Sequence, residues 1–218
     1  MRRLVAGLAV ALLLSGCGAG TDGWAEPRPM PSPVGTLGPG FVDPSAPPTP
    51  EGTITPVPGS WDGVQPARGY RVVLLTKGTD GPTTALVTAV RGWAAAEHAD
   101  LRTVTVGADP VPDIIRAVDM HPDLIVSAGN ELVDPLAVIT ASHLSQPFLV
   151  VGAELAEPTH NVTAVDWAGA SFRGEGLGAS STYDAASFTA QRCDAAIRAG
   201  AAAVLTGLTG IVVWLEDR

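Results

Sequence analysis

From Tyr70 to Arg218 the sequence alternates short apolar runs with longer segments of helical periodicity, and this alternation constrains the fold most. Five runs rich in β-branched residues have the composition of strands covered on both faces. They occupy residues 71–76, 101–106, 123–127, 147–151 and 161–166. Helices are expected from about Thr83, after Asp109, from about Val133 and over residues 189–206. Strands joined by helical crossovers pair in parallel, so residues 70–218 are predicted to form one doubly wound, Rossmann-like α/β sheet.

The start of the chain has the order of parts found in an export signal. Arg2 and Arg3 precede an apolar run at residues 4–14, which is too short to span a bilayer because a spanning helix needs roughly 20 residues. The run ends in Leu-Ser-Gly-Cys at residues 14–17, which resembles a bacterial lipobox. The resemblance implies that residues 1–16 are a signal peptide, that Cys17 is lipidated, and that the protein is held at the extracytoplasmic face of the cell membrane. An ordinary secretory signal is the alternative.

Residues 17–69 are predicted to be a disordered, lipid-anchored linker rich in proline and glycine. Twelve of the 19 prolines lie between Pro27 and Pro66, and the segment has neither strand nor helix periodicity. Proline removes a backbone donor and fixes φ, which favours extended chain over helix or sheet. We therefore expect a semi-rigid spacer in which Trp24 and Trp61 dock locally. A proline-rich ligand for a partner domain is the alternative.

The composition argues against several classes of protein. Thirteen Lys and Arg residues stand against 22 Asp and Glu residues, a formal net charge of −9, and no basic stripe gathers the positive charges, so nucleic acid is not expected as a partner. The histidines at 98, 121, 143 and 160 lack the spacing of metal ligands, and we expect neither a metal nor a cofactor. Residues 174–178, Gly-Glu-Gly-Leu-Gly, do not fit a dinucleotide fingerprint. With Cys17 acylated, Cys193 has no disulfide partner and is expected to be a packed hydrophobe, with a reactive thiol as the alternative.

Ligands of doubly wound sheets bind beyond the carboxyl ends of the strands, where loops and helix N-termini leave a crevice. The candidate ligand-binding residues follow the first, third and fifth expected strands, and they are Lys77, Thr79, Asp80, Asn130, Asp166 and Trp167. For Asp80, Asn130 and Asp166 the competing interpretation is helix capping or turn formation, since Asp and Asn commonly bond backbone donors there. Trp167 is either a stacking platform or an aromatic at the edge of the core.

About 100 residues of the expected domain resemble the basic membrane protein lipoproteins. The resemblance is carried by Gly-Thr-Asp at 78–80, Arg-Gly-Trp at 91–93, and the segments 122–130, 147–152, 161–167 and 169–176. Members of this family are type I substrate-binding proteins of ABC importers, and several bind purine nucleosides between two Rossmann-like lobes. The resemblance implies the fold of one such lobe, a small polar ligand, and an ABC permease as partner.

The sequence also departs from this family. Only 149 residues follow Gly69, which is enough for a single lobe, and no second lobe is inserted between Gly178 and Phe188. Ala85 and Leu86 stand where the family places an aromatic ring and an amide that contact the ligand. We therefore expect nucleoside binding to be weak or absent. A homodimer would supply the missing opposite wall of the cleft.

Two functional hypotheses follow. The first is a non-enzymatic surface lipoprotein that retains ligand or accessory binding. The second is an envelope protein interaction module that has lost small-molecule binding. An enzyme is least favoured, because the sequence has no Gly-x-Ser-x-Gly elbow and no carboxylate pair that spacing alone identifies.

Overall fold

The computed structural model describes residues 23–24, 26–170, 172–179 and 181–216, so the predicted signal peptide and Cys17 lie outside the described residues. Its centre is a seven-stranded sheet in which every pair of neighbouring strands is parallel. The strands are β2 (Thr53–Ile54), β4 (Arg71–Thr76), β5 (Asp100–Thr105), β6 (Leu124–Ala128), β7 (Phe148–Val151), β8 (Val162–Trp167) and β9 (Ile211–Leu215). Their order is β2-β9-β8-β7-β6-β4-β5. The prediction of a doubly wound parallel α/β sheet is confirmed.

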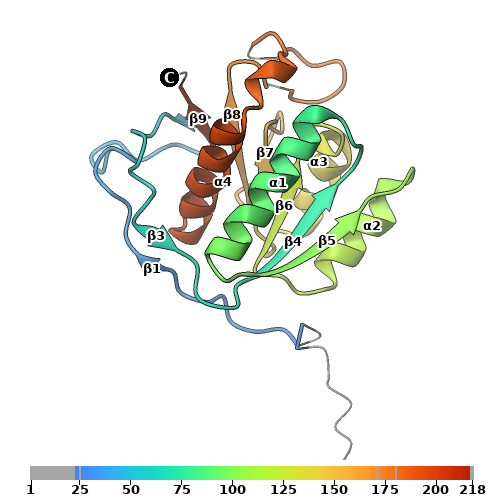
Figure 1. The fold of residues 1–218 in the computed structure, drawn as a ribbon, viewed down its shortest axis with the longest axis horizontal. Coiled ribbons are helices and arrows are strands. Elements are labelled where there is room, and N and C mark those ends of the chain that lie inside the picture. The colour runs from blue at the N-terminus through green and yellow to red at the C-terminus, as the bar shows by residue number, and fades with distance from the viewer. Residues whose placement is uncertain (1–22, 25, 171, 180, 217–218) are drawn as a thin grey trace, which may run out of the picture.

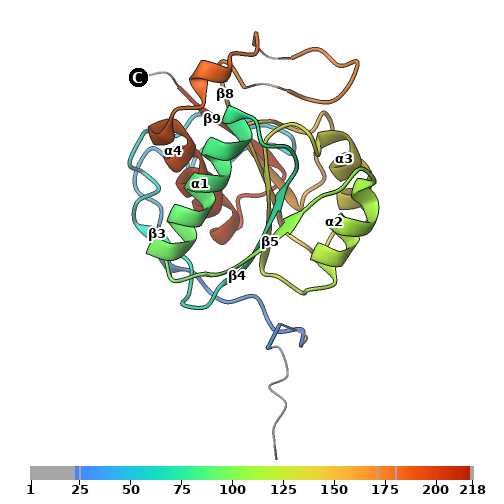
Figure 2. The same cartoon turned by 45° about the vertical axis from the view of Figure 1, so that its right-hand side comes forward.

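Helices cover both faces of the sheet. They are α1 (Gly81–Ala96), α2 (Pro110–Val118), α3 (Val133–Ser142) and α4 (Ala190–Leu205), with a 3-10 turn η1 at Ala185–Ser187. Helices α1 and α4 pack together over one face, while α2 and α3 pack together over the other (Figures 1 and 2). Each helix and strand expected from the sequence is present, with ends shifted by about one or two residues.

Local capping chemistry sets the starts of α1 and α4. Asp80 accepts a hydrogen bond from the Thr83 backbone nitrogen at the start of α1, and the Thr189 hydroxyl accepts one from the Arg192 backbone nitrogen at the start of α4. Such caps satisfy donors that the helix itself leaves unpaired. Asp109 precedes α2 as expected, but its side chain makes no capping hydrogen bond. Pro110 starts that helix instead, in a position where its missing donor costs nothing.

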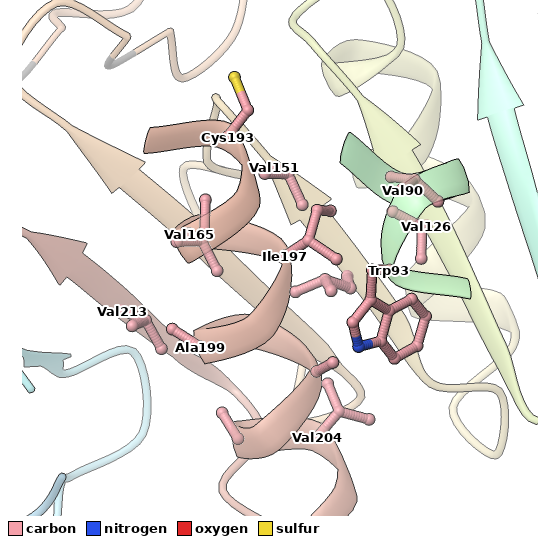
Figure 3. Packing of buried hydrophobic residues seen from close by; sticks show 14 of the residues in the cluster. Val90, Trp93, Val126, Val151, Val165, Cys193, Ile197, Ala199, Val204 and Val213 are labelled. Atoms are coloured by element: carbon pink, nitrogen blue, oxygen red, sulfur yellow. The ribbon is translucent and has the colours of Figure 1, made fainter. Parts of the chain in front are cut away.

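The core between the sheet and the α1/α4 layer combines aromatic rings, Trp93 among them, with valines, leucines and the small side chains of α4 (Figure 3). Helix α4 approaches the sheet closely at Gly200, where an added Cβ would stand 2.6 Å from both Leu149 Cδ1 and Val165 Cγ2. Cys193 is fully buried in the same cluster and forms no disulfide, as expected of a packed hydrophobe. The alanine-rich sequence of α4 therefore serves this close contact, because larger side chains would not fit against the strands.

Strand β9 was not expected from the sequence. Ile211–Leu215 pairs with β8 in parallel and continues the sheet beyond the fifth expected strand. The run Ile-Val-Val-Trp-Leu follows Gly210 and precedes Glu216, so its composition matches the strands that were recognised. The same rule applied to the last residues would have found it.

The expectation of a disordered spacer at residues 17–69 is wrong for residues 26–69, which lie against the domain. Ile54 and Thr53 form β2 and add a strand beside β9, while β1 (Val34–Gly35) and β3 (Val64–Gln65) form a small antiparallel pair. Phe41 and Trp61 are 1% and 6% exposed and belong to the core on the α1/α4 side. The domain therefore begins far upstream of Tyr70.

The expectation failed because a segment that forms neither helix nor regular sheet can still pack against a folded domain. Proline excludes helix and regular sheet, but it also restricts the unfolded chain and so lowers the entropy lost on docking. Isolated aromatic side chains then hold the irregular segment in place without any periodic pattern. Trp24 and Trp61 were expected to dock locally, and both are buried.

Within the described part of the chain, no helix has both the length and the hydropathy that a membrane span requires.

Candidate functional site

The chain reverses its direction of travel across the sheet at the junction of β4 and β6. It leaves β4 through α1 to reach β5 on one side, then returns through α2 to β6 on the other side. In doubly wound sheets, such a topological switch point is where a crevice for ligands lies, beyond the carboxyl ends of the two strands. Thr76 at the end of β4 lies opposite Ala128 at the end of β6. The loops that begin with Lys77 and Gly129 therefore start side by side.

Lys77 and Asn130 are the predicted residues that remain available at this junction. Both side chains are half-buried, and neither forms a hydrogen bond or ion pair with another described residue. Gly78 and Gly129 follow the two strands with φ values of 84° and 85°, a left-handed conformation that suits glycine. These turns direct the chain into α1 and toward α3. The structure thus brings an ammonium group and an amide to neighbouring strand ends.

Asp80 caps α1, as one of its two interpretations predicted. Its Oδ1 accepts a 2.9 Å hydrogen bond from the Thr83 nitrogen, and its Oδ2 accepts a 2.7 Å bond from Thr83 Oγ1. Burial raises the pKa of Asp80, but the hydrogen bonds from Thr83 outweigh this, so the pKa lies below its ordinary value. Thr79 beside it is exposed. The carboxylate remains charged at neutral pH and contributes one negative charge to the edge of the crevice.

The loop between β8 and α4 lies over the carboxyl ends of the strands (Figure 1). Glu175 donates its backbone N–H to Asp134 Oδ1 of α3 at 3.1 Å, which fixes one part of the loop. Tyr183, which is 50% exposed, stands close enough to Asp80 for that charge to act on it. Burial raises the pKa of the Tyr183 hydroxyl, and the charges of Asp80 and Asp184 raise it further. Sequence reasoning did not identify Tyr183, because nothing in the spacing places this loop above β4.

Asp166 and Trp167 do not join this crevice. Their strand β8 is separated from β6 by β7, and both side chains are fully buried. Trp167 packs edge to face on Phe188 with ring centroids 5.0 Å apart, and its Nε1 donates a 3.0 Å hydrogen bond to Ser187 Oγ. Of the two interpretations of Trp167, the structure supports the core aromatic. Its ring has no exposed face on which a ligand would stack.

A groove of about 570 Å³ lies elsewhere, between the proline-rich segment and α4. The indoles of Trp61 and Trp93 form part of its lining. Arg198 also lines it, with Nε 3.0 Å from Asp194 Oδ2 and Nη1 3.4 Å from Glu97 Oε1. The volume falls within the range of small-molecule sites. The sequence did not predict this groove, since one of its walls belongs to the segment interpreted as a spacer.

The described residues contain no group of three or more His, Cys, Asp and Glu side chains that could hold a metal ion. Cys193 is buried, and burial raises the pKa of its thiol to about 11. A thiol in that state is protonated at neutral pH and is a poor nucleophile.

No family model matches the sequence, and no curated protein matches it significantly. Among solved structures, the chain is similar to one described as "Crystal structure of ABC transporter system solute-binding proteins from Aeropyrum pernix K1". The similarity has a TM-score of 0.38 and 18% sequence identity, and it covers 45% of this chain. This chain thus spans only 28% of the length of that protein.

Proposed function

We propose that the protein is a non-enzymatic binding protein, held on the extracytoplasmic face of the cell membrane by lipid on Cys17. The export signal and the Leu-Ser-Gly-Cys sequence at residues 14–17 support the anchor. The resemblance to the basic membrane protein lipoproteins supports a ligand at the crevice of a single lobe. An ABC permease or another envelope protein would be the partner, and a homodimer would cover the open side.

The observation that carries this proposal is the position of Lys77. It is the only lysine in the 218 residues, and it stands at the switch point of the sheet without an ion-pair partner among the described residues. An unpaired ammonium beside the Asn130 amide offers donors to the acceptor oxygens of a small polar ligand. Thr79 and Tyr183 add hydroxyl groups nearby. A hydroxylated metabolite with an acidic or carbonyl group fits this set of donors.

A nucleoside fits less well. Leu86 is fully buried and points into the core rather than toward the crevice, and Ala85 has no group that stacks or hydrogen-bonds. A single lobe covers less of a ligand than the 70–90% typical of closed sites, roughly half of its surface. The affinity for a nucleoside is therefore expected to be weak, and its nucleobase should contribute little of the binding free energy.

Thermal unfolding with added metabolites tests the crevice. A ligand that binds only the folded protein raises the melting temperature by linkage. We expect a rise with sugar acids or related polar metabolites, a smaller one or none with nucleosides, and loss of the rise in Lys77→Ala. Lys77→Arg keeps the charge and is the matched control. If no metabolite at millimolar concentration shifts the melting temperature, the proposal that the crevice binds a small polar ligand is wrong.

The anchor is tested separately by mass spectrometry of the mature protein from membranes. The expected mature N-terminus is a diacylated or triacylated Cys17, and Cys17→Ser should release the protein from the membrane fraction. An unmodified N-terminus at another residue would overturn the lipid anchor without bearing on the crevice.

The groove beside α4 favours a second candidate, the envelope interaction module. Its lining combines two tryptophans with ion-paired charged residues, and tryptophan and arginine are enriched in protein interfaces. Ala195 lines this groove, so Ala195→Trp should fill it and abolish a partner that docks there. Co-purification from detergent-solubilised membranes should then lose the partner in Ala195→Trp but keep it in Lys77→Ala. The reverse pattern would assign the partner to the crevice.

A further inference from the structure

The start of the described chain is fastened to the amino end of the sheet. Trp24 is 3% exposed, and its Nε1 donates a 2.6 Å hydrogen bond to Asp100 Oδ2 at the beginning of β5. The Arg102 guanidinium lies over the indole ring, 4.2 Å from its centroid. Arg71 of β4 donates hydrogen bonds to the carbonyl oxygens of Gly23 and Glu26. The Arg71 guanidinium also lies 5.9 Å from the indole centroid, so the indole is held from two neighbouring strands, β4 and β5.

A second contact extends the fastening to β6. Arg28 forms an ion pair with Asp123, which precedes β6 and is 4% exposed, and donates a 2.9 Å hydrogen bond to the Gly69 carbonyl. The same carboxylate accepts a 2.7 Å hydrogen bond from the Arg71 backbone nitrogen. Removing Arg28 is costly, because it leaves the buried Asp123 carboxylate without its ion-pair partner. Residues 23–24 and 26–28 are thus bound where β4, β5 and β6 begin.

These contacts leave very little free chain before them. Only five residues, 18–22, separate Cys17 from Gly23, and fully extended chain covers at most about 3.6 Å per residue. A lipid on Cys17 would therefore lie within roughly 22 Å of the amino end of the sheet. If all of residues 17–69 were a spacer, the lipid could lie more than about 100 Å from the sheet. The contacts of Trp24 and Arg28 with the sheet therefore keep the domain close to the lipid.

From this we infer that the protein sits on the membrane in one orientation, with the amino end of its sheet against anionic phospholipid headgroups and the carboxyl end, where Lys77 lies, facing away. This inference rests on the proposed lipid anchor. Figure 1 shows the geometry: the blue start of the described chain lies below the sheet, and the orange loop between β8 and α4 lies at the opposite end. Six-residue strands place the two ends roughly 20 Å apart along the strands.

The charges favour the same orientation. At the amino end, Arg28, Arg68, Arg71, Arg102 and Arg116 stand against seven acids, an excess of two negative charges. The acids are Glu26, Glu51, Glu97, Asp100, Asp119, Asp123 and Glu157. The loops and first helical turns at the carboxyl end carry nine acids against Lys77, Arg173 and Arg192, an excess of six negative charges. The acids are Asp80, Asp109, Asp113, Glu131, Asp134, Glu154, Glu175, Asp184 and Glu216. An anionic bilayer repels negative charge within about one Debye length, roughly 8 Å at physiological salt. The less acidic amino end therefore approaches the surface at lower electrostatic cost.

Energy transfer from single labelled cysteines to a lipid dye tests the orientation. The full lipidated chain is reconstituted in vesicles of phosphatidylcholine and phosphatidylglycerol that contain a rhodamine lipid. Asp119→Cys places the donor at the amino end and Ala185→Cys at the carboxyl end, since both positions are exposed. Cys193 is buried and should escape labelling of the folded protein. We expect several-fold more transfer from position 119 than from position 185.

Two controls isolate the cause. Inserting about ten Gly and Ser residues after Gly20 leaves the domain unchanged but adds a flexible tether, and it should remove most of the difference between the two labels. Trp24→Ala combined with Arg28→Ala should do the same, with thermal unfolding used to check that the sheet remains folded. Equal transfer from both positions in the acylated parent protein, or more from position 185, would overturn the orientation. A mature chain without acyl groups would overturn the anchor itself, and the orientation with it.

Discussion

Ile54 of β2 lies opposite Val213 of β9 in a parallel pair of strands. The proline-rich segment thereby closes one edge of the sheet, and Phe41 and Trp61 from the same segment fill the core beside it. We expect a fragment of residues 70–218 to be much less stable than one of residues 23–218. It would lose two buried aromatic rings, each worth about 3–5 kcal/mol in typical truncations, and would expose the edge of β9 to aggregation.

Urea denaturation of the two fragments, followed by tryptophan fluorescence and circular dichroism, measures this difference. Phe41→Ala in the longer fragment is the milder variant and should lower the unfolding midpoint without changing the chain length. Equal midpoints for the two fragments would mean that the upstream segment is not part of the folding unit.

Substitution by alanine should destabilise the protein at Gly200 and stabilise it at Gly92. A Cβ at Gly200 would stand 2.6 Å from Leu149 Cδ1 and Val165 Cγ2, so Gly200→Ala forces α4 away from the sheet and should cost about 1–3 kcal/mol. Gly92 is exposed on α1, and a Cβ added there would meet no atom within 4 Å, so Gly92→Ala should gain up to about 1 kcal/mol from helix propensity. Chemical denaturation of both variants checks the pair, and a stabilising Gly200→Ala would contradict the close packing of α4.

Asp80 should act mainly as a helix cap. Asp80→Ala removes both hydrogen bonds to Thr83 and should destabilise the protein by about 1 kcal/mol. Since its pKa is lower in the folded protein, its charged form stabilises folding above the ordinary pKa, and that stabilisation is lost as the pH falls through the acid range. The difference in unfolding free energy between parent and variant should therefore shrink at acid pH. A difference that grows on acidification would have the wrong sign for a charged cap.

Cys193 should make the protein less stable at high pH. Burial raises its pKa from 9.0 to about 11, so between these values the unfolded chain loses a proton that the folded chain retains. Stability is unaffected by this thiol below pH 9 and should fall, by on the order of 2 kcal/mol, as the pH rises toward 11. Cys193→Ala removes that contribution, and the Tyr70 hydroxyl, whose pKa is also raised by burial, is common to both proteins.

Maleimide labelling of the parent protein, with Cys193→Ala as the control, tests whether the Cys193 thiol is buried. A maleimide should label Cys193 in the parent only after denaturation, because the thiol is fully buried in the folded protein. Rapid labelling of the native protein at neutral pH would show that α4 opens readily from the sheet.

The candidate site was only partly accessible from the sequence. Lys77, Asp80 and Asn130 were identified because the carboxyl ends of parallel strands gather at one edge, a rule that needs only strand assignment. Whether Trp167 faced a crevice or the core depended on Phe188 and Ser187, which stand about 20 residues later in the chain. Tyr183 and the groove beside α4 arise from loops whose paths have no periodic signature.

The sequence by itself determined the parallel α/β domain, because buried β-branched runs and amphipathic helices are local patterns that repeat at fixed spacing. It also determined the caps at Asp80 and Thr189, where a side chain bonds a backbone nitrogen three residues away. Only the tertiary structure decided that the proline-rich segment belongs to the domain, and that Trp24 and Arg28 attach it to β4, β5 and β6. Those contacts join residues 76 and 95 positions apart, and no local preference encodes a partner at such a distance.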